Sequence, residues 1–383
     1  MFCLNDKQTK LREELRAFVE DNLSPQAAEL EDSGAFSREL FRRLGRQGYL
    51  DMCFYHQRPD AAYGSVESTI ILEEIARGLP SLALSISPHI QCMNLIALYG
   101  KPGLKARLLP HALSGDILFG FAISEDSGGS EALAIDTTAS FVGDGWVLNG
   151  NKCWITNASA ADGYIVAAKS ARSGKYRDVS LFYVSADTPG LDDKLRAQLT
   201  GMRNSPTGSL VLNNCKVPSE CLVGKENEAY SLMKVLLNEG RLNMAALAVG
   251  MAGASMECAI RHTSSSGRYG RNLASYQGVS FQVARMYEKI FMAKNSLYAV
   301  AEMFQSQQRA TMEVAALKLF SSEMCMEVCR SAVQLHGAKG LSRFSVVERN
   351  FRDCQALTIA EGSSEICQII ISGKLYHMQP GER

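Results

Sequence analysis

The chain has 383 residues, of which 46% are hydrophobic and 21% are charged, a composition typical of a globular protein. A chain of this length is expected to form two or three domains. Lysine plus arginine and aspartate plus glutamate both number 40, so the net charge favours neither nucleic acid nor an anionic membrane, although local basic segments stand at 169–177 and 268–271.

The N-terminus and the cysteines indicate a reduced, cytoplasmic environment. Residues 1–12 lack the apolar core of a signal peptide, and no apolar run of about 18 residues suggests a membrane span. The 11 cysteines are an odd number scattered through apolar segments, which argues against a disulfide framework. Cys325 and Cys329 lie one helical turn apart, but no further ligand stands at metal spacing, so we interpret them as core thiols and predict no metal site.

Residues 1–117 are predicted to form an α-helical domain. Apolar residues at helical spacing predict helices over 4–24, 37–44, 66–77 and 82–99. We expect the first helix to end at Ser24 and Pro25, and the second to end at Gly45. The last helix contains a polar stretch, His89 to Asn94, which fits either an exposed helix end or the wall of a pocket.

Residues 118–225 are predicted to form a β-domain, and residues 226–383 a C-terminal helical bundle. Strand patterns cover 118–124, 134–142, 146–148, 153–155, 164–169, 179–184 and 209–212. The turn Gly143-Asp144-Gly145 predicts a hairpin. In the C-terminal part a long apolar seam runs from Val283 to Phe304 and is interrupted by Lys294. The predicted fold class is therefore α+β, with helices, then a β-barrel or sandwich, then helices.

The stretch from Thr358 to Ile366 is where we expect the chemistry. Its carboxylate, Glu361, is followed directly by Gly362, which has no Cβ and lets a flat molecule approach the main chain. Ser363 and Ser364 add hydroxyl groups. The same four residues also fit an ordinary helix N-terminus capped by one of the serines, so this motif alone is weak.

Two further motifs fit a ring-shaped cofactor. Residues 121–131 leave a strand and enter a glycine-rich loop, which is neither a Walker loop nor a dinucleotide-binding fingerprint. Trp154 and Thr156 then stand on the same face of a strand. An aromatic plane beside a hydroxyl donor suits a flavin, whereas the alternative interpretation is a buried strand tryptophan followed by a turn at Asn157.

Taken together, these motifs resemble the acyl-CoA dehydrogenase family from Leu11 to about Leu375. Six motifs follow the family's order: the glycine-rich loop, Trp-Ile-Thr-Asn, the end of the β-domain, the Gln-Leu-His-Gly segment, the Glu-Arg and Arg-Asp pairs, and Glu-Gly-Ser-Ser-Glu-Ile. They stand at 121–131, 149–157, 201–224, 334–340, 348–353 and 361–366.

The resemblance implies that the C-terminal domain is a four-helix bundle and that FAD binds between the β-domain and this bundle. Residues lining the isoalloxazine or its attached chain would be Phe121, Ile123, Ser124, Gly129, Ser130, Trp154, Thr156, Ser363 and Glu365, with the Thr156 hydroxyl near N5. Family members are commonly tetramers, in which one subunit contacts the FAD of its neighbour. The residues that match this second set are Arg268, Tyr269, Gln277, Gln334, Gly337 and Ala338. Ser266 replaces the usual family arginine, and Arg268 is the cation that we expect to substitute for it.

The resemblance also assigns the catalytic base. Most family members carry it where Glu361 stands, and a minority carry it directly before the arginine that matches Arg241. Here that position is Gly240, and Glu239 is one place away, about 100° around a helix. Glu361 is therefore the predicted base. Ser130, Asn238, Arg241, Ala360 and Gly362 are the predicted substrate contacts, and Ala360 replaces the motif's usual aromatic residue.

The implied reaction is α,β-dehydrogenation of an acyl thioester. Glu361 would remove the α-proton while the β-carbon passes hydride to FAD N5, and the Glu361 N–H with a ribityl hydroxyl would stabilise the enolate. The substrate carrier is CoA or an acyl carrier protein, and the electron acceptor is an electron-transfer flavoprotein, another acceptor, or oxygen as in an oxidase. The alternative of another class is a catalytically silent flavoprotein that binds a partner or nucleic acid.

Overall fold

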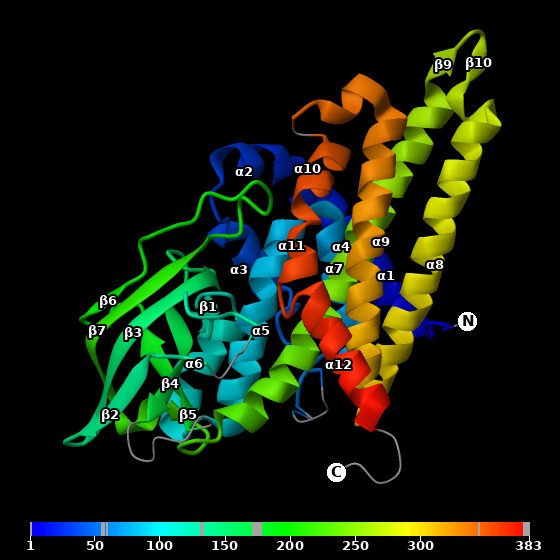
Figure 1. Cartoon of the computed structure of the whole chain (residues 1–383). Coiled ribbons are helices and arrows are strands. Elements are labelled where there is room, and N and C mark those ends of the chain that lie inside the picture. The colour runs from blue at the N-terminus through cyan, green and yellow to red at the C-terminus, as the bar shows by residue number, and fades with distance from the viewer. Residues whose placement is uncertain are drawn as a thin grey trace.

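A computed structural model describes residues 2–54, 58, 60–130, 134–170, 178–343 and 345–377. Helices occupy both ends of the chain, and a sheet lies between them in sequence and to one side in space (Figure 1). Helix α5, Pro80–Tyr99, contacts strand β1, helix α4 and helix α7, so it joins the sheet to both helical regions. The three-part α+β architecture predicted from the sequence is confirmed.

The N-terminal helices begin with α1, Asp6–Phe18, which continues through a π-helical turn, Val19–Leu23, a 3-10 turn, Ser24–Gln26, and α2, Ala27–Ser33. The predicted stop at Ser24 and Pro25 is wrong. Pro25 stands in the first turn of a new helical segment, where an N–H would have no helical partner anyway, so the ring is tolerated and the chain stays helical.

The second predicted helix is α3, Arg38–Arg46, and its end at Gly45 is also wrong because Gly45 lies inside it. A Cβ at this position would stand 2.3 Å from the backbone of Ser114. The glycine is therefore needed for the close approach between α3 and the end of α6, Pro102–Leu113, and not to end a helix. Helix α4, Ser65–Gly78, and α5 match the predicted positions.

The middle region is one hydrogen-bonded sheet of eight strands in the order β6-β7-β3-β2-β4-β5-β8, with β1 paired to β4. Strands β2 and β3 form the predicted hairpin. Strand β1 runs parallel to β4, and β2 and β4 pair in parallel over a short stretch. The strands are β1, Phe119–Ala122; β2, Thr138–Val142; β3, Gly145–Thr156; β4, Gly163–Ser170; β5, Val179–Ser185; β6, Leu191–Asp192; β7, Thr207–Pro218; and β8, Leu222–Val223.

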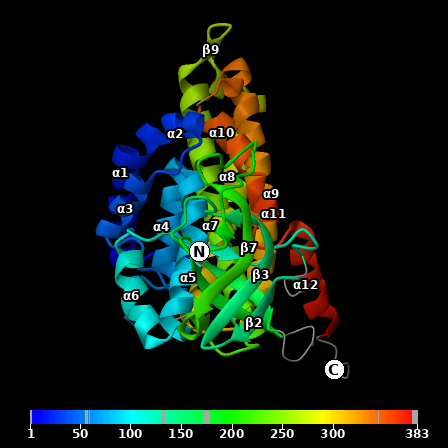
Figure 2. The ribbon, with the colours of Figure 1, turned by 90° about the vertical axis from the view of Figure 1, so that its left-hand side faces the viewer.

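The C-terminal region is built from three long helices followed by three short ones. These are α7, Ala229–Ser265; α8, Gln277–Gln305; α9, Thr311–His336; α10, Val346–Asp353; α11, Ala356–Ile359; and α12, Ser364–His377. A two-stranded hairpin that the sequence did not predict, β9, Gly267–Arg268, and β10, Arg271–Asn272, extends beyond the ends of α7 and α8. Figures 1 and 2 both place it at the end of the molecule away from β2.

Two helices, α5 and α7, are long and apolar enough to cross a membrane by length and composition. In this fold 89% of the apolar window of α5 and 72% of that of α7 are buried inside the protein. Their apolar side chains are therefore covered by the sheet and by neighbouring helices, which is the environment of core helices.

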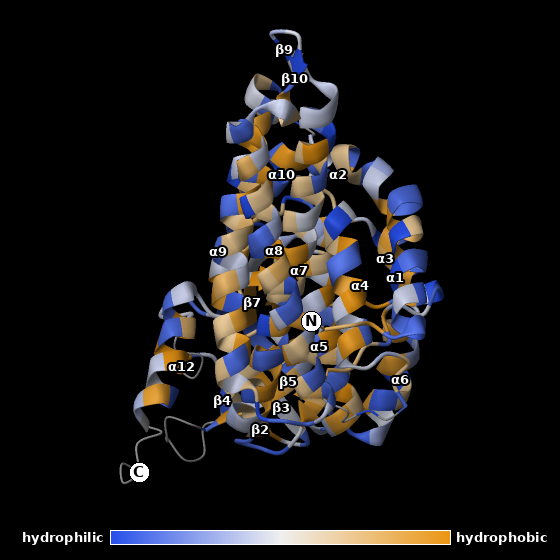
Figure 3. Ribbon diagram, turned by 90° about the vertical axis from the view of Figure 1, so that its right-hand side faces the viewer, coloured by the Kyte–Doolittle hydropathy of each residue, from blue (hydrophilic) through white to orange (hydrophobic). Residues whose placement is uncertain are grey.

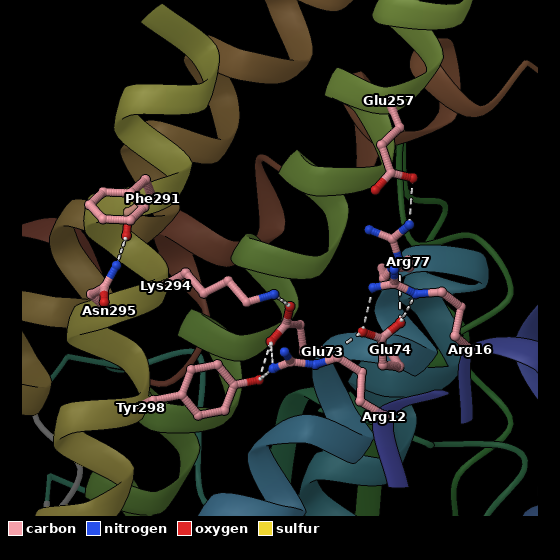
Figure 4. Close-up of polar contacts among 10 residues, drawn as sticks. All are labelled: Arg12, Arg16, Glu73, Glu74, Arg77, Glu257, Phe291, Lys294, Asn295 and Tyr298. Atoms are coloured by element: carbon pink, nitrogen blue, oxygen red, sulfur yellow. Dashed lines mark hydrogen bonds and ion pairs between the residues drawn. The ribbon is translucent and has the colours of Figure 1, made fainter. Parts of the chain in front are cut away.

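A cluster of charged side chains joins the two helical regions (Figure 4). Glu73 on α4 accepts a hydrogen bond from Lys294 Nζ of α8 at 2.6 Å and another from the Tyr298 hydroxyl. Glu74 binds Arg16 of α1 at 2.9 Å. Burial alone would raise the pKa of Glu73. The nearby cations Lys294 and Arg12 outweigh this effect and hold the pKa of Glu73 below its usual value. The cluster borders a cavity of about 430 Å³, but its carboxylates already have cationic partners.

We expect Glu73→Gln to lower the free energy of unfolding by about 3–5 kcal/mol, because it removes the buried charge that pairs with the partly exposed Lys294 and Arg12 and with the buried Tyr298 hydroxyl. The matched control is Glu257→Gln, whose carboxylate pairs with Arg77 at 2.6 Å but has 39% side-chain exposure. Such an exposed pair contributes about 1 kcal/mol or less. Urea unfolding of the FAD-loaded variants measures both changes. Equal losses would mean that the buried cluster has no special role in joining the helices.

Candidate active site

Glu361 lies in a tight turn between α11 and α12. Its φ is 57°, and that of Gly362 is 102°, so two successive residues adopt left-handed backbone conformations. For a residue with a side chain this conformation costs about 1–3 kcal/mol and persists only where the surroundings hold it. Ser363 accepts a 3.5 Å hydrogen bond from Ile366 N, so the capping interpretation is also correct. The turn directs the Glu361 side chain toward α5 and α7.

Gln91 and Gly240 surround the Glu361 carboxylate. Gln91 Nε2 donates to the Leu236 carbonyl at 3.0 Å and to Glu361 Oε1 at 3.4 Å. A Cβ on Gly240 would stand 2.1 Å from Glu361 Oε2 and 2.7 Å from Gln91 Nε2. The Glu361 carboxylate therefore occupies the space next to Gly240 of α7. A side chain at position 240 would displace the carboxylate.

Burial is the main influence on the protonation of Glu361. It raises the pKa of Glu361 to about 7, against the opposing effects of Arg241, Gln91 and Lys318. Burial also raises the pKa of Glu239 to about 8, and the negative charge of Glu361 adds to that shift. Glu361 is thus the first of the two carboxyl groups to ionise as pH rises, and it ionises in the range where a general base works best.

Two basic residues hold the turn that carries Glu361. Lys318 of α9 is fully buried, and its Nζ donates to the Gly362 carbonyl at 2.6 Å and the Thr358 carbonyl at 3.2 Å. These carbonyls flank Glu361 on both sides. Arg241 lies under Gly362 and donates from Nη1 to Asn238 Oδ1 at 2.9 Å. The sequence did not single out Lys318, because nothing in its own segment distinguishes it from a solvent-exposed helical lysine.

We expect Lys318→Met to lower the rate of substrate-dependent flavin reduction by about 10- to 100-fold, because the turn loses its anchor and the base is displaced. The matched control is Lys289→Met, a surface lysine on α8 that pairs with Glu327. Stopped-flow absorbance under anaerobic conditions gives the rate. If Lys318→Met keeps the rate of the parent protein, the lysine does not position Glu361.

Trp154 and its neighbours form a partly open surface near the C-terminal end of strand β3. The Trp154 side chain is 66% exposed, and its φ is 57°, at an irregularity in the pairing of β3 with β7. The interpretation of Trp154 as a buried strand residue is therefore wrong. Thr156, Phe121, Ile123 and Ser124 are half-buried beside this strand region, and Gly129 and Ser130 are exposed in the following loop. A large exposed aromatic ring next to half-buried apolar and hydroxyl groups leaves a flat face for a ligand.

Buried polar contacts fix the segments that form this surface. Lys152 Nζ donates to Glu125 Oε1 at 2.7 Å and to the Ile123 carbonyl at 3.0 Å. Asn157 Nδ2 donates to the carbonyls of Ser85 and Phe119, each at 2.8 Å. The glycine-rich loop and the end of β3 are thereby attached to each other and to α5. Residue 131, the last of the glycine-rich motif, lies outside the described residues.

The remaining predicted cofactor contacts lie at the other end of the molecule. Arg268 and Tyr269 are on the β9–β10 hairpin, and Gln277 begins α8. Gln334, Gly337 and Ala338 are at the end of α9, which is joined to the end of α7 by stacking of His262 on His336 at 4.4 Å. These residues cluster together, but the fold does not bring them to the Trp154 surface of the same chain (Figure 1).

Among the described residues no group of three or more histidine, cysteine, aspartate or glutamate side chains could hold a metal ion. Cys325 and Cys329 are fully buried, with their sulfur atoms 3.8 Å apart, and Cys329 also lies 3.4 Å from the Ser255 hydroxyl. They are core thiols, as interpreted from the sequence.

Comparisons with known proteins cover nearly the whole chain. Sequence models of the N-terminal, middle and C-terminal domains of acyl-CoA dehydrogenase match residues 5–116, 120–215 and 229–376. The chain is 32% identical to the mitochondrial short-chain specific acyl-CoA dehydrogenase of Rattus norvegicus over 97% of this chain and 90% of that protein.

Solved structures of similar proteins have the same fold. Butyryl-CoA dehydrogenase from Megasphaera elsdenii superposes with a TM-score of 0.93 at 29% identity, covering 98% of this chain and 100% of that one. A glutaryl-CoA dehydrogenase from Mycobacterium smegmatis, solved in complex with FADH2, gives 0.91 at 25% identity, covering 99% and 97%. The chain belongs to the acyl-CoA dehydrogenase family, whose members are FAD-containing oxidoreductases that act on CH–CH groups.

Proposed function

We propose that the protein dehydrogenates an acyl thioester between its α- and β-carbons, with Glu361 as the base that takes the α-proton. The observation that carries this proposal is the position of Glu361, half-buried above Gly240, hydrogen-bonded to Gln91 and with a pKa raised by burial to about 7. A carboxylate in such surroundings is a stronger base than one in water.

The residues near the C-terminal end of β3 fit FAD. The exposed Trp154 ring offers a plane for the isoalloxazine, Thr156 offers a hydroxyl, and Gly129 and Ser130 lie on an exposed loop. Ser363 and Glu365 at the start of α12 complete this proposed set. When bound, FAD supplies the acceptor for the hydride from the β-carbon. The chain itself orients the thioester, excludes water around Glu361 and holds the proton on the Glu361 carboxylate.

Asn238 and Arg241 on α7, with Ser130, Ala360 and Gly362, are the proposed contacts of the thioester and its phosphopantetheine arm. Asn238 positions Arg241 next to Gly362, so a cation stands close to Glu361. Arg241 lowers the pKa of Glu361, but burial has the larger effect and the pKa stays at about 7. The small Ala360 side chain, half-buried beside the base, leaves room for the acyl group. Coenzyme A and acyl carrier proteins both present this arm, and either carrier fits the proposal.

The rate of flavin reduction should depend on pH around neutrality. Only the ionised Glu361 can accept the α-proton, and its pKa is raised to about 7. The rate should therefore be highest above pH 7 and fall about tenfold per pH unit well below it. Stopped-flow traces from pH 5.5 to 9 with one saturating substrate measure this profile. A rate that stays constant down to pH 5.5 would contradict a base with this pKa.

Anaerobic bleaching of the FAD-loaded protein tests the proposed reaction. Short acyl-CoAs and the same acyl groups on carrier proteins would be mixed with the protein, and absorbance of the oxidised flavin followed. Bleaching with formation of a 2,3-enoyl thioester supports the proposal, and the better carrier identifies the substrate class. Bound FAD that no thioester bleaches would overturn it and favour a silent binding protein.

We propose a homotetramer in the cytoplasm that passes electrons to an electron-transfer flavoprotein or another acceptor. Two observations support an assembly. The second group of predicted FAD contacts lies far from strand β3, which carries Trp154 of its own chain (Figure 1). Exposed apolar side chains also lie on α8, α9 and α12, helices whose ribbons include hydrophobic, orange segments in Figure 3. Those side chains are Phe281, Tyr287, Met292, Phe320, Ile369, Leu375 and Tyr376.

We also propose that the boundaries between the three domains lie after residues 117 and 225.

A further inference from the structure

A short chain of hydrogen bonds connects the start of α9 to the turn that carries Glu361. Thr311 is the first residue of α9, and its hydroxyl oxygen accepts a hydrogen bond from Asn238 Nδ2 of α7 at 3.1 Å. Asn238 Oδ1 accepts one from Arg241 Nη1 at 2.9 Å. The Arg241 guanidinium lies against Gly362, since a Cβ on that glycine would stand 3.5 Å from Nη2. The Thr311 hydroxyl is thus two hydrogen bonds away from a cation beside the turn.

The hydrogen-bonding capacity of each group fixes how the Asn238 amide is oriented. A guanidinium only donates, so the Asn238 atom that faces Arg241 is the oxygen. The NH₂ group of Asn238 then points to Thr311, whose hydroxyl oxygen can accept. With the amide turned the other way, an N–H would face the guanidinium and that hydrogen bond would be lost. The Thr311 hydroxyl therefore gives the amide a second point of attachment in the orientation that Arg241 requires.

Arg241 depends on such support because it is almost completely buried, with 5% of its surface exposed. A charged group that has lost its hydration must find fixed hydrogen-bond acceptors inside the protein. Besides Asn238, its partners include the Cys367 side chain of α12. A thiol is a weak acceptor, so the amide oxygen of Asn238 is the stronger of these two partners.

Helix α9 holds two cations near Glu361. Lys318 reaches the turn directly, through hydrogen bonds to two of its backbone carbonyls. Thr311 stands about two helical turns earlier on the same face of α9, and it reaches Arg241 through Asn238. Both cations lower the pKa of Glu361, and Arg241 has the larger effect of the two.

The other groups that face Glu361 have little charge at pH 7. Gln91 of α5 lowers the pKa of Glu361 through a hydrogen bond and carries no charge. Glu239 of α7 is mostly protonated, because burial and then Glu361 raise its pKa to about 8. Burial also raises the pKa of the Cys92 thiol on α5, which therefore stays neutral. The position of Arg241 is thus a main influence on the pH at which Glu361 ionises.

We infer that Thr311 is a positioning residue for the proposed dehydrogenation: through Asn238 it holds Arg241 beside the turn that carries the base. The inference rests on the proposed function, because it concerns the same Glu361. Thr311 takes no direct part in the proton transfer. It keeps a positive charge where that charge favours the ionised carboxylate, so Glu361 can act as a base at a lower pH than burial alone would allow.

Thr311→Val tests this role, because it removes the hydroxyl and keeps the shape of the side chain. The Asn238 amide loses its second attachment and Arg241 moves from the turn, so the midpoint of Glu361 ionisation should rise by about half a pH unit or more. Well below pH 7 the rate of flavin reduction should then fall about threefold, whereas at pH 9 it should equal that of the parent protein. Thr311→Ala removes the same hydroxyl and should raise the midpoint in the same direction, so the test does not depend on the folding of one variant.

Two further variants separate positioning from a general loss of structure. Thr311→Ser keeps the hydroxyl and should keep the midpoint of the parent protein. Thr263→Val is the matched control on α7, because Thr263 is buried and its hydroxyl donates to the Ala259 carbonyl at 2.8 Å, far from Glu361 in the chain. It should lower the stability of the protein and leave the midpoint unchanged. Melting curves with FAD show that each variant is folded.

Infrared spectra of the FAD-loaded protein, recorded from pH 5.5 to 9, measure the ionisation of Glu361 without turnover. The band of the protonated carboxyl group that Glu361→Gln lacks belongs to Glu361. A midpoint in Thr311→Val and Thr311→Ala equal to that of the parent protein would overturn the inference. A rise of the same size in Thr311→Ser or in Thr263→Val would also overturn it.

Flavin bleaching with the same variants separates this inference from the proposed function. If the infrared midpoint rises as expected but no thioester bleaches the flavin of any variant or of the parent protein, the positioning role stands and the dehydrogenase proposal fails. If thioesters bleach the flavin and the midpoint does not move, the dehydrogenase proposal stands and the positioning role of Thr311 fails.

Discussion

Glu361→Gln should lower the rate of flavin reduction by an acyl thioester by about 10³-fold or more while FAD remains bound. Glutamine has nearly the same size and can keep the hydrogen bond with Gln91, so the turn at φ 57° is preserved. It cannot accept the α-proton. Anaerobic stopped-flow absorbance measures the rate, and the FAD content of the purified variant, together with its visible spectrum, shows that the cofactor site is intact.

The control for this prediction is Glu239→Gln. Glu239 is the other buried carboxyl group near the site, and its higher pKa means that it is mostly protonated while Glu361 is ionised. Its amide variant should retain flavin reduction and should leave the apparent pKa of the rate close to that of the parent protein. If instead Glu361→Gln stays active and Glu239→Gln does not, the base is Glu239 and the assignment made from the sequence motif is wrong.

Gly240→Ala should lower the same rate by about 10²-fold, although alanine is a better helix former than glycine. The added Cβ would stand 2.1 Å from Glu361 Oε2 and 2.2 Å from its Cδ, a distance that real atoms do not reach. The carboxylate must therefore move away from the substrate, and its hydrogen bond with Gln91 is lost. Rates from stopped-flow absorbance, together with thermal unfolding, separate displacement of the base from loss of the fold.

Gly278→Ala in α8 is the matched control, because a Cβ at that position meets no atom within 4 Å. It should keep the parent rate and raise the free energy of unfolding by about 0.5–1 kcal/mol. A Gly240→Ala variant as active as the Gly278→Ala variant would mean that Glu361 has another productive position, so the geometry described for the base would not be the working one.

The sequence predicted the larger part of this molecule. The order of helical and strand patterns predicted the three-part fold, and the turn Gly143-Asp144-Gly145 predicted the hairpin of β2 and β3, because these signals depend on residues close together in the chain. The choice of Glu361 over Glu239 as the base stays a prediction. The sequence analysis failed at Pro25 and Gly45, where general helix-stop rules were overridden by a second helical segment and by contact with Ser114.

The surroundings of the base could not be predicted in the same way. Gln91 and Lys318 reach Glu361 and its turn from helices that are distant in sequence, and Gln91 and Glu361 are 270 positions apart in the chain. The sequences around Gln91 and Lys318 show only apolar or amphipathic helical patterns. Ordinary core helices show the same patterns, so the sequence does not mark either residue as part of a site. The polar stretch at His89 to Asn94 suggested a pocket wall, and its burial shows that it is not an exposed helix end. Which of its side chains face Glu361 and Glu239 depends on how α5 packs against α7.

The charge cluster around Glu73 has a consequence for synthesis of the chain on the ribosome. Glu73 and its partner Lys294 are 221 residues apart, and the amide of Val66 at the start of α4 is bound by Gln305, 239 residues later. When the first helices leave the ribosome, Arg12 of α1 is available to Glu73, but the partners from α8, Lys294, Tyr298 and Gln305, have not yet been made. The N-terminal helices therefore cannot complete their own core by themselves. We therefore expect them to be less stable, and more open to proteolysis, until α8 has been translated and packs against them.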